Sequence, residues 1–149
     1  MSQHKATLTW KRGDADFSYK TYSRNHQWDF GPESSITASA AAQYLGDETK
    51  VDPEQAFVAS LSSCHMLTFL AIASMKKIVV ESYEDQAIGH LEKNEDGVMA
   101  ITRVDLYPKI EFAGGQEPDK ATQEKFHELA HKQCFLANSV KCPIKVNLT

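Results

Sequence analysis

The sequence has few cysteines and lacks a paired cysteine motif. Its 149 residues include only Cys64, Cys134 and Cys142, and no two of them form a C-x-x-C pair. This absence excludes a thioredoxin-type redox motif and a ribbon-type zinc site. An odd cysteine count without a secretory leader is typical of a reducing compartment, where cysteines serve catalysis or metal binding more often than structural disulfides. We therefore expect a cytoplasmic protein whose thiols have a chemical role.

The sequence also lacks a basic cluster and an N-terminal apolar run. The net charge is −4 and the lysines and arginines are scattered, which argues against nucleic acid as the main partner. The polar first seventeen residues do not form a signal peptide. The one segment of membrane length, residues 56–75, is interrupted by several serines, a histidine and a threonine. This composition favours a buried core helix over a membrane span.

The length suits a single domain over residues 1–149 with its own core. The pattern of apolar residues and turn residues predicts these elements in order: a β-hairpin over 4–22, an extended segment over 24–30, a loop with one short strand or turn over 33–50, a helix over 51–77, a long hairpin over 79–112, a second helix over 118–137, and a closing strand over 141–148. This order predicts an α+β fold in which antiparallel strands pack on helices.

The predicted central helix organises the chain. Asp52 is a good N-cap, Pro53 suits the first helical position, and Gln55 completes a capping box. Residues 56–75 carry no formal charge and are apolar nearly all round, so a single sheet cannot cover them. We therefore expect a partner subunit to cover this helix, most simply in a two-fold homodimer.

Cys64 lies in the middle of this helix, too far from the N-terminus to gain its thiolate-stabilising field. A reactive Cys64 therefore needs a cation, and no lysine or arginine lies within a helical turn. The best candidate is Arg24, in a segment rich in aromatic and hydrogen-bonding side chains. A buried arginine needs an acid partner, and Glu54 at the start of the helix can supply it.

Distance restricts this arrangement. Glu54 and Cys64 are ten residues apart, roughly 15 Å along a continuous helix. Either the helix breaks between them, or two copies run antiparallel across a dimer axis; we favour the second because the helix also needs a cover. An oxidised Cys64 needs a second thiol to resolve it, and this thiol is Cys134 or Cys142. We favour Cys134 because it lies on the apolar face of the second helix.

The segment VDPEQAFVASLSSCH resembles the Asn/Asp-Pro-Glu-Glu/Gln…Ala-Ala-Cys helix of the OsmC/Ohr family of thiol peroxidases, and the order of elements is similar along nearly the whole chain. The resemblance implies an OsmC-like intertwined homodimer that reduces organic hydroperoxides without a cofactor, using an external dithiol or lipoyl reductant. It implies that Cys64 is the peroxidatic cysteine, that Cys134 resolves it by forming a disulfide, and that an arginine–glutamate pair, here Arg24 and Glu54, activates Cys64.

The sequence departs from the family pattern in two places. The second motif is usually Cys-Pro, whereas here Cys134 is followed by phenylalanine, and the Cys142-Pro143 dipeptide is interpreted as unrelated. One branch of the family carries its arginine shortly before the central helix, where this chain has Gln43. Arg24 must then act from the early strands, as in the other branch. The segment SRNHQWDFGP looks like the signature of an OsmC-like subgroup. The sequence does not indicate the substrate of that subgroup.

Two other functions are compatible with the same residues. The scaffold can serve as a non-catalytic protein that binds an apolar molecule at the dimer interface, in which case Cys64 is unreactive. The spacing of His127, His131 and Cys134 on one helix face can also bind zinc, although a fourth ligand must come from elsewhere. Because of that missing ligand, we predict no metal site.

Overall fold

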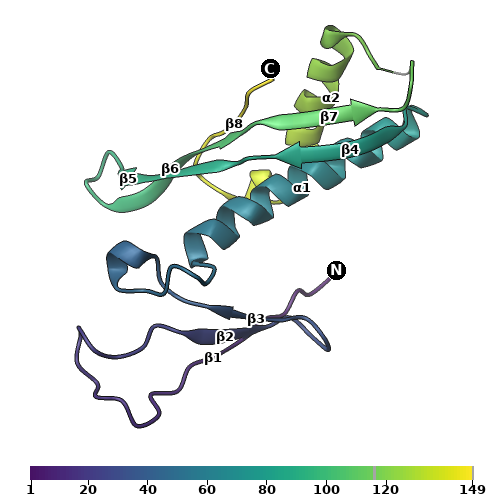
Figure 1. Ribbon diagram of the computed structural model, residues 1–149. Coiled ribbons are helices and arrows are strands. Elements are labelled where there is room, and N and C mark those ends of the chain that lie inside the picture. The colour runs from purple at the N-terminus through teal and green to yellow at the C-terminus, as the bar shows by residue number, and fades with distance from the viewer. Residues whose placement is uncertain (116, 149) are drawn as a thin grey trace. The chain divides into compact units, whose positions relative to one another are not determined.

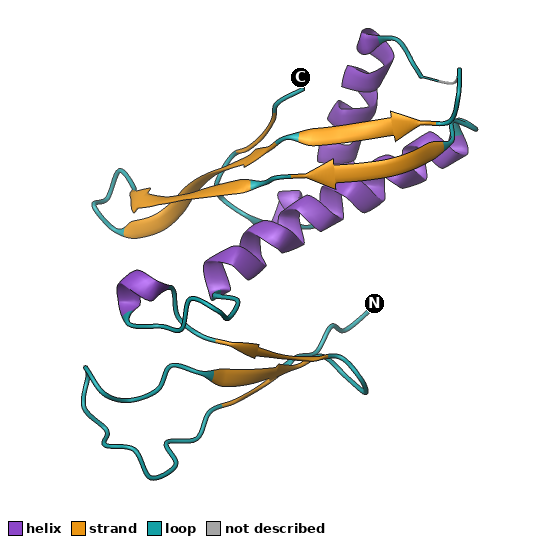
Figure 2. Cartoon of the chain, in the orientation of Figure 1, coloured by secondary structure: helices purple, strands orange, loops and turns teal. Residues whose placement is uncertain are grey.

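The computed structural model describes residues 1–115 and 117–148. The chain divides into two compact units, the N-terminal unit Met1–Ala56 and the C-terminal unit Phe57–Thr149. Helices and antiparallel strands occur together, so the predicted α+β class is confirmed (Figures 1 and 2). The single domain predicted over residues 1–149 stays a prediction, and each unit is described by itself.

The N-terminal unit is a small antiparallel sheet followed by a 3₁₀ turn. Its strands lie in the order β1-β2-β3, with Leu8 opposite Trp28 and Trp28 opposite Ile36. The elements are β1 (Thr7–Thr9), β2 (His26–Asp29), β3 (Ser35–Ala38) and η1 (Ala42–Tyr44). The extended segment predicted over 24–30 is therefore strand β2, and the predicted loop contains one strand.

The hairpin predicted over residues 4–22 is wrong in its second half. Residues 16–22 form loops and turns, and β1 pairs with β2 instead. The aromatic residues that suggested a strand pack on one another, with the rings of Trp10, Phe17 and Tyr22 separated by 5.4–6.2 Å. The alternating aromatic residues form a cluster of rings in a loop. The sequence pattern alone does not distinguish such a loop from a β-strand.

Helix α1 (Pro53–Met75) is the predicted central helix. Its capping box is formed as expected, because the Gln55 amide donates to Asp52 Oδ1 at 2.7 Å and the Asp52 amide donates to Gln55 Oε1 at 3.1 Å. The helix ends where Lys77 takes a left-handed conformation, with the Ile78 amide donating to the Ala73 carbonyl.

The long hairpin of the C-terminal unit is also confirmed, with each arm divided into two strands. Antiparallel pairs join the outer strands β4 (Val80–Asp85) and β7 (Pro108–Phe112), and the inner strands β5 (Ile88–Lys93) and β6 (Met99–Leu106). Where the arms break, the Asp85 carboxylate accepts hydrogen bonds from the Tyr107 amide, at 2.7 Å, and from the Ser62 hydroxyl of α1. The Asp85 carboxylate therefore connects the hairpin to the central helix.

Helix α2 (Lys120–Gln133) begins at Asp119, whose carboxylate accepts from the Thr122 amide, and is followed by η2 (Ala137–Ser139). The closing strand is shorter than predicted, β8 (Ile144–Val146), and pairs with β6 in parallel. The expectation of purely antiparallel strands is thus wrong at this pair. A helix crossover separates β8 from the hairpin, and such a crossover lets a strand return in parallel.

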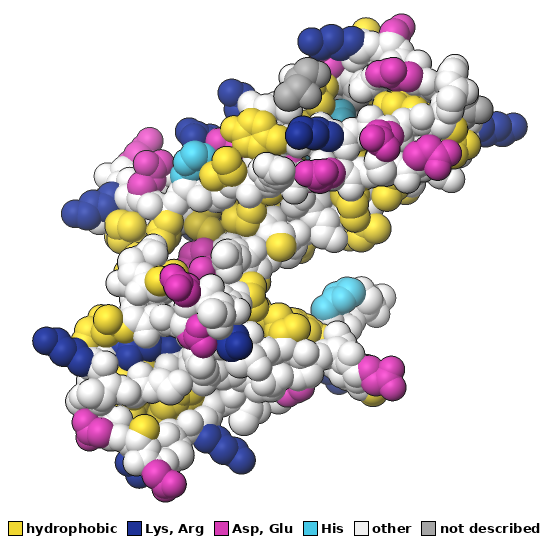
Figure 3. Space-filling model, in the orientation of Figure 1, with side chains coloured by type: hydrophobic (Ala, Val, Ile, Leu, Met, Phe, Trp, Pro, Cys, Tyr) yellow, Lys and Arg dark blue, Asp and Glu magenta, His cyan; other side chains and the backbone are white. Residues whose placement is uncertain are grey.

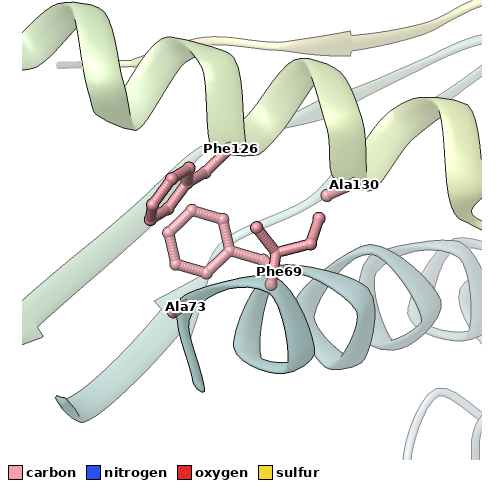
Figure 4. Packing of buried hydrophobic residues seen from close by; sticks show 5 residues of the cluster. Phe69, Ala73, Phe126 and Ala130 are labelled. Carbon is pink, nitrogen blue, oxygen red and sulfur yellow. The ribbon is translucent and has the colours of Figure 1, made fainter. Parts of the chain in front are cut away.

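Two apolar clusters form the core of the C-terminal unit. In the larger one, Phe69, Ile72 and Ala73 of α1 face Phe126 and Ala130 of α2 (Figure 4). Side chains of β4 and β7 cover this cluster. The smaller one joins Leu61 of α1 to two residues of β6, Val104 and Leu106. Both clusters fix α1 against the neighbouring elements.

Much of α1 is not covered by the rest of the C-terminal unit. Its Leu67 and Met75 are 60% and 72% exposed, and hydrophobic side chains reach the surface along this helix (Figure 3). The covering by a partner subunit stays a prediction. In the described part of the chain, α1 alone has the length and hydropathy of a membrane span; this is weak evidence, since the core helix of a globular protein has the same properties.

Candidate functional site

Two of the predicted site residues meet in the C-terminal unit. Cys64, in the middle of α1, is half-buried, whereas Cys134, directly after the last residue of α2, is 1% exposed. Their side chains are neighbours, because Cys64 is one of the groups that raise the pKa of Cys134, and both are free thiols. Two neighbouring thiols can form a disulfide once their side chains and backbone reach the required geometry.

The helix pairing explains why these thiols meet. Along the contact, Cys64 lies against Cys134, His65 against His127, and Phe69 against Phe126. Residue numbers rise on α1 while they fall on α2, so the two helices run in opposite directions at their interface. The apolar faces that the sequence predicted for both helices therefore set the register of the cysteines.

The two thiols differ in their surroundings. Burial, together with the neighbouring Cys64 side chain, raises the pKa of Cys134, although the Ala137 amide donates to its Sγ at 3.4 Å and opposes this effect. Cys134 therefore remains protonated at neutral pH and is shielded from large reagents. Cys64 is the more accessible of the pair. This asymmetry suits a first reaction at Cys64 and a second at Cys134.

A pair of buried histidines lies next to the thiols. His65 Nε2 and His127 Nδ1 are 3.0 Å apart and the planes of the two rings are nearly parallel, at 4°. Burial lowers the pKa of each imidazole to about 4, so both are neutral at physiological pH. The sequence placed each histidine on a helix but did not predict this pairing; the one signal was their position among apolar residues.

The structure gives no geometric basis for the zinc hypothesis. His127 turns to His65, and Cys134 turns to Cys64. Among residues 1–115 and 117–148, no group of three histidine, cysteine or acidic side chains is arranged to hold a metal ion. The helical spacing of His127, His131 and Cys134 was compatible with a metal, but His127 and Cys134 lie beside different residues of α1.

Arg24 and Glu54 belong to the N-terminal unit and are not brought together within one chain. The guanidinium of Arg24 donates to the carbonyl oxygens of Tyr22 and Tyr19, at 2.7 and 2.5 Å, and lies 3.9 Å from the centre of the Tyr22 ring. No ion pair joins Arg24 to Glu54 among the described residues. Glu54 lies in the first turn of α1, as predicted, and is half-buried. Their predicted role stays a prediction.

Cys142 lies apart from the thiol pair in its packing. It contacts the apolar cluster of Leu61, Val104 and Leu106 and is half-buried. Its surroundings are those of a packing residue, in keeping with the interpretation that the Cys142-Pro143 dipeptide is unrelated to the family motif.

Comparisons with known proteins identify the family. The family model for OsmC-like protein matches residues 46–149. An OsmC-like protein of unknown function from Vibrio cholerae is 47% identical over 100% of both chains, with a TM-score of 0.95. The organic hydroperoxide resistance protein OhrB of Bacillus subtilis is 21% identical over 97% of this chain and 98% of its own, with a TM-score of 0.67. The same fold occurs in an organic hydroperoxide resistance protein OsmC from Legionella pneumophila, 15% identical over 99% and 97% of the two chains, with a TM-score of 0.67. A search of curated proteins gives no match.

Proposed function

The chain belongs to the OsmC family, and on this premise we propose that it is a thiol-dependent peroxidase that reduces organic hydroperoxides. The contact between Cys64 and Cys134 carries this proposal, because it supplies the accessible thiol and the buried second thiol that such a reaction needs. The names of the Bacillus and Legionella relatives, which are hydroperoxide resistance proteins, support the same class of substrate.

In the first step, the Cys64 thiolate attacks the distal oxygen of the hydroperoxide. The S–O bond forms, the O–O bond breaks, and the alkoxide takes up a proton and leaves as an alcohol. Cys64 is oxidised to a sulfenic acid and the peroxide is reduced. A nearby cation stabilises both the thiolate and the charge that develops on the leaving oxygen, and we assign this role to Arg24.

In the second step, the Cys134 sulfur attacks the sulfenic sulfur of Cys64. The S–S bond forms, the S–O bond breaks, and the hydroxyl leaves as water with the proton of the Cys134 thiol. An external dithiol or lipoyl group then reduces the disulfide and is itself oxidised. The raised pKa of Cys134 keeps it protonated until Cys64 has reacted.

Activation of Cys64 is the part of the proposal that needs a second copy of the chain. We propose a cytoplasmic homodimer in which the exposed apolar face of α1 is covered and Glu54 of one copy orients an arginine toward the thiols of the other. Arg24 must then exchange its tyrosine carbonyl partners for the carboxylate. A carboxylate is the stronger partner, because both groups of that pair are charged.

A second candidate function is the binding of an apolar molecule. It is favoured by a cavity of about 370 Å³ in the C-terminal unit, lined by Phe57, Ile101, Val140, Lys141 and Cys142. The cavity lining includes Cys142 and neither cysteine of the thiol pair. A binding function at this cavity therefore leaves the contact between Cys64 and Cys134 without a role.

Stopped-flow oxidation of the reduced protein separates the two functions. The protein is mixed with cumene hydroperoxide or with hydrogen peroxide, and the products are identified by mass spectrometry. The peroxidase predicts faster oxidation by the organic peroxide and a Cys64–Cys134 disulfide, unchanged in the matched variant Cys142→Ser. Slow oxidation without preference for one peroxide, or for one of the three thiols, would contradict the proposal and favour ligand binding.

A further inference from the structure

The buried histidine pair connects the two helices that carry the thiols. His65 directly follows Cys64 on α1, and His127 lies seven residues, two helical turns, before Cys134 on α2. The two imidazoles are 2% and 3% exposed and their facing nitrogens are 3.0 Å apart. The pair is thus a directional contact across the same helix interface as the thiols.

We propose that the His65–His127 hydrogen bond is a positioning contact that holds Cys64 and Cys134 in the arrangement from which their disulfide closes. The proposal rests on the proposed peroxidase function. Disulfide formation tolerates only a narrow range of separations and torsions between the two cysteines. A small shift of α2 along α1 changes both, so a contact that fixes this shift affects the rate of closure directly.

The hydrogen bond is better suited to this task than the apolar contacts around it. Apolar packing sets the overall register of the helices but has no directional preference, whereas a buried imidazole that loses its partner keeps an unsatisfied polar group. The His127 ring also packs against Phe69, with ring centres 4.5 Å apart. Its other nitrogen, Nε2, is buried without a hydrogen-bond partner among the described residues, so the bond to His65 is the hydrogen bond that orients this ring.

The electrostatic state of the pair supports a positional role. Burial keeps both imidazoles neutral at physiological pH, so they add no positive charge beside Cys64. The pair therefore does not replace the arginine as the activator of the thiolate. Its loss should leave the first oxidation of Cys64 nearly unchanged and slow the second, intramolecular step.

Amide side chains of two lengths provide matched variants. In His127→Asn, the side-chain amide occupies the place of Nδ1 and can still bond to His65, whereas in His127→Gln it reaches toward the place of Nε2 and cannot. At the other position the requirement is reversed, since His65 uses Nε2: His65→Gln keeps the bond and His65→Asn loses it. His131→Gln, on the exposed side of α2, is the control for an added amide.

Two measurements on each variant test the proposal. Stopped-flow mixing with cumene hydroperoxide gives the rate of Cys64 oxidation and the rate of disulfide closure, and dimedone traps sulfenic acid that has not closed. We expect closure to slow roughly ten- to a hundredfold in His127→Gln and His65→Asn, with more trapped sulfenic acid. The variants His127→Asn, His65→Gln and His131→Gln should stay within about threefold of wild type, because displacements below an ångström cost far less.

The second measurement does not depend on peroxidase activity. Equilibration with reduced and oxidised glutathione gives the effective concentration of Cys134 at Cys64, and the same order of variants is expected. If wild-type Cys64 does not react with the peroxide but the glutathione series keeps this order, the proposed function fails and the positioning contact stands. Equal closure rates and effective concentrations in folded His127→Gln and His127→Asn would overturn the positioning contact. If His127→Gln does not fold, the pair at position 65 decides in the same way.

Discussion

The two compact units differ in what holds them together. Among the described residues, every buried apolar side chain except Ala38 lies in the C-terminal unit, where two clusters fix α1, α2 and the hairpin. The N-terminal unit depends on strand hydrogen bonds and on aromatic residues that remain largely exposed, such as Phe17 at 65%. Apolar burial is the main source of folding free energy, so one chain stabilises the two units very unequally.

The difference also separates the chemistry. The thiols lie beside the helix interface of the C-terminal unit, which has the larger core, whereas Arg24 lies in the unit with the small core, held by carbonyl groups of its own loop. Bond formation between two sulfurs needs a fixed distance. A stabilising charge acts over a longer range and can be supplied by a segment that moves. The following predictions test this division.

The largest effect is expected on activity. Cys64→Ser should lower the rate of hydroperoxide reduction at least about a thousandfold, because the nucleophile is lost. Arg24→Met should lower it roughly a hundredfold, since one charged donor to the transition state is lost. Steady-state assays with cumene hydroperoxide measure both, and Arg12→Met, an exposed arginine bonded to the Ala15 carbonyl in the same unit, is the control. Equal rates for Arg24→Met and Arg12→Met would remove Arg24 from the mechanism.

The next effect is on global stability. Phe69→Ala should lower the free energy of unfolding by about 3–5 kcal/mol, because Phe69 is fully buried between α1 and α2. Phe17→Ala, in the exposed aromatic cluster of the N-terminal unit, should cost less than about 1 kcal/mol. Urea denaturation measures both. Similar costs at the two positions would show that the N-terminal unit is buried in the native assembly.

As the pH falls, the C-terminal unit should lose stability before the N-terminal unit does. Burial lowers the pKa values of His65 and His127 from 6.5 to about 4. Below pH 6.5 the unfolded chain therefore binds protons at these histidines that the folded chain does not bind. The C-terminal unit is therefore fully stabilised above pH 6.5 and loses about 3 kcal/mol for each of the two histidines as the pH falls toward 4.

In the N-terminal unit, hydrogen bonds from Thr49 lower the pKa of Asp47 below 3.8, so its contribution is lost only under more acidic conditions. Thermal unfolding between pH 7 and 4.5 tests this order. The double variant His65→Gln/His127→Asn should have a smaller pH dependence than wild type. An unchanged pH dependence in this variant would contradict the role of the histidines.

The smallest effect concerns the residue that begins the helix shared by the two units. Asp52→Ala should cost about 1 kcal/mol, because the Gln55 amide loses its acceptor, whereas Asp52→Asn should retain most of the cap. Amide hydrogen exchange shows which part of α1 loses stability. We expect faster exchange in the first turn of α1 and little change at Phe69. Faster exchange throughout α1 would show that the helix unfolds as one unit.

Local chemistry explains which elements were predictable. The capping box of Asp52 and Gln55, the two helices and the long hairpin are local signals, and each forms as expected. The predicted strand over 16–22 failed because its aromatic residues pack in a loop. The parallel pairing of β8 with β6 was missed because it depends on the path of the chain after α2.

The sequence by itself determined the two helices, the hairpin and the family, because these depend on periodicity, capping and a local motif around Cys64. Only the tertiary structure decided which side chains meet: Cys64 with Cys134, His65 with His127, and Arg24 with tyrosine carbonyls in place of Glu54. These contacts depend on the register of two helices and on the path of a loop. Register follows from the packing of whole apolar faces, a sum over many side chains that no short motif encodes.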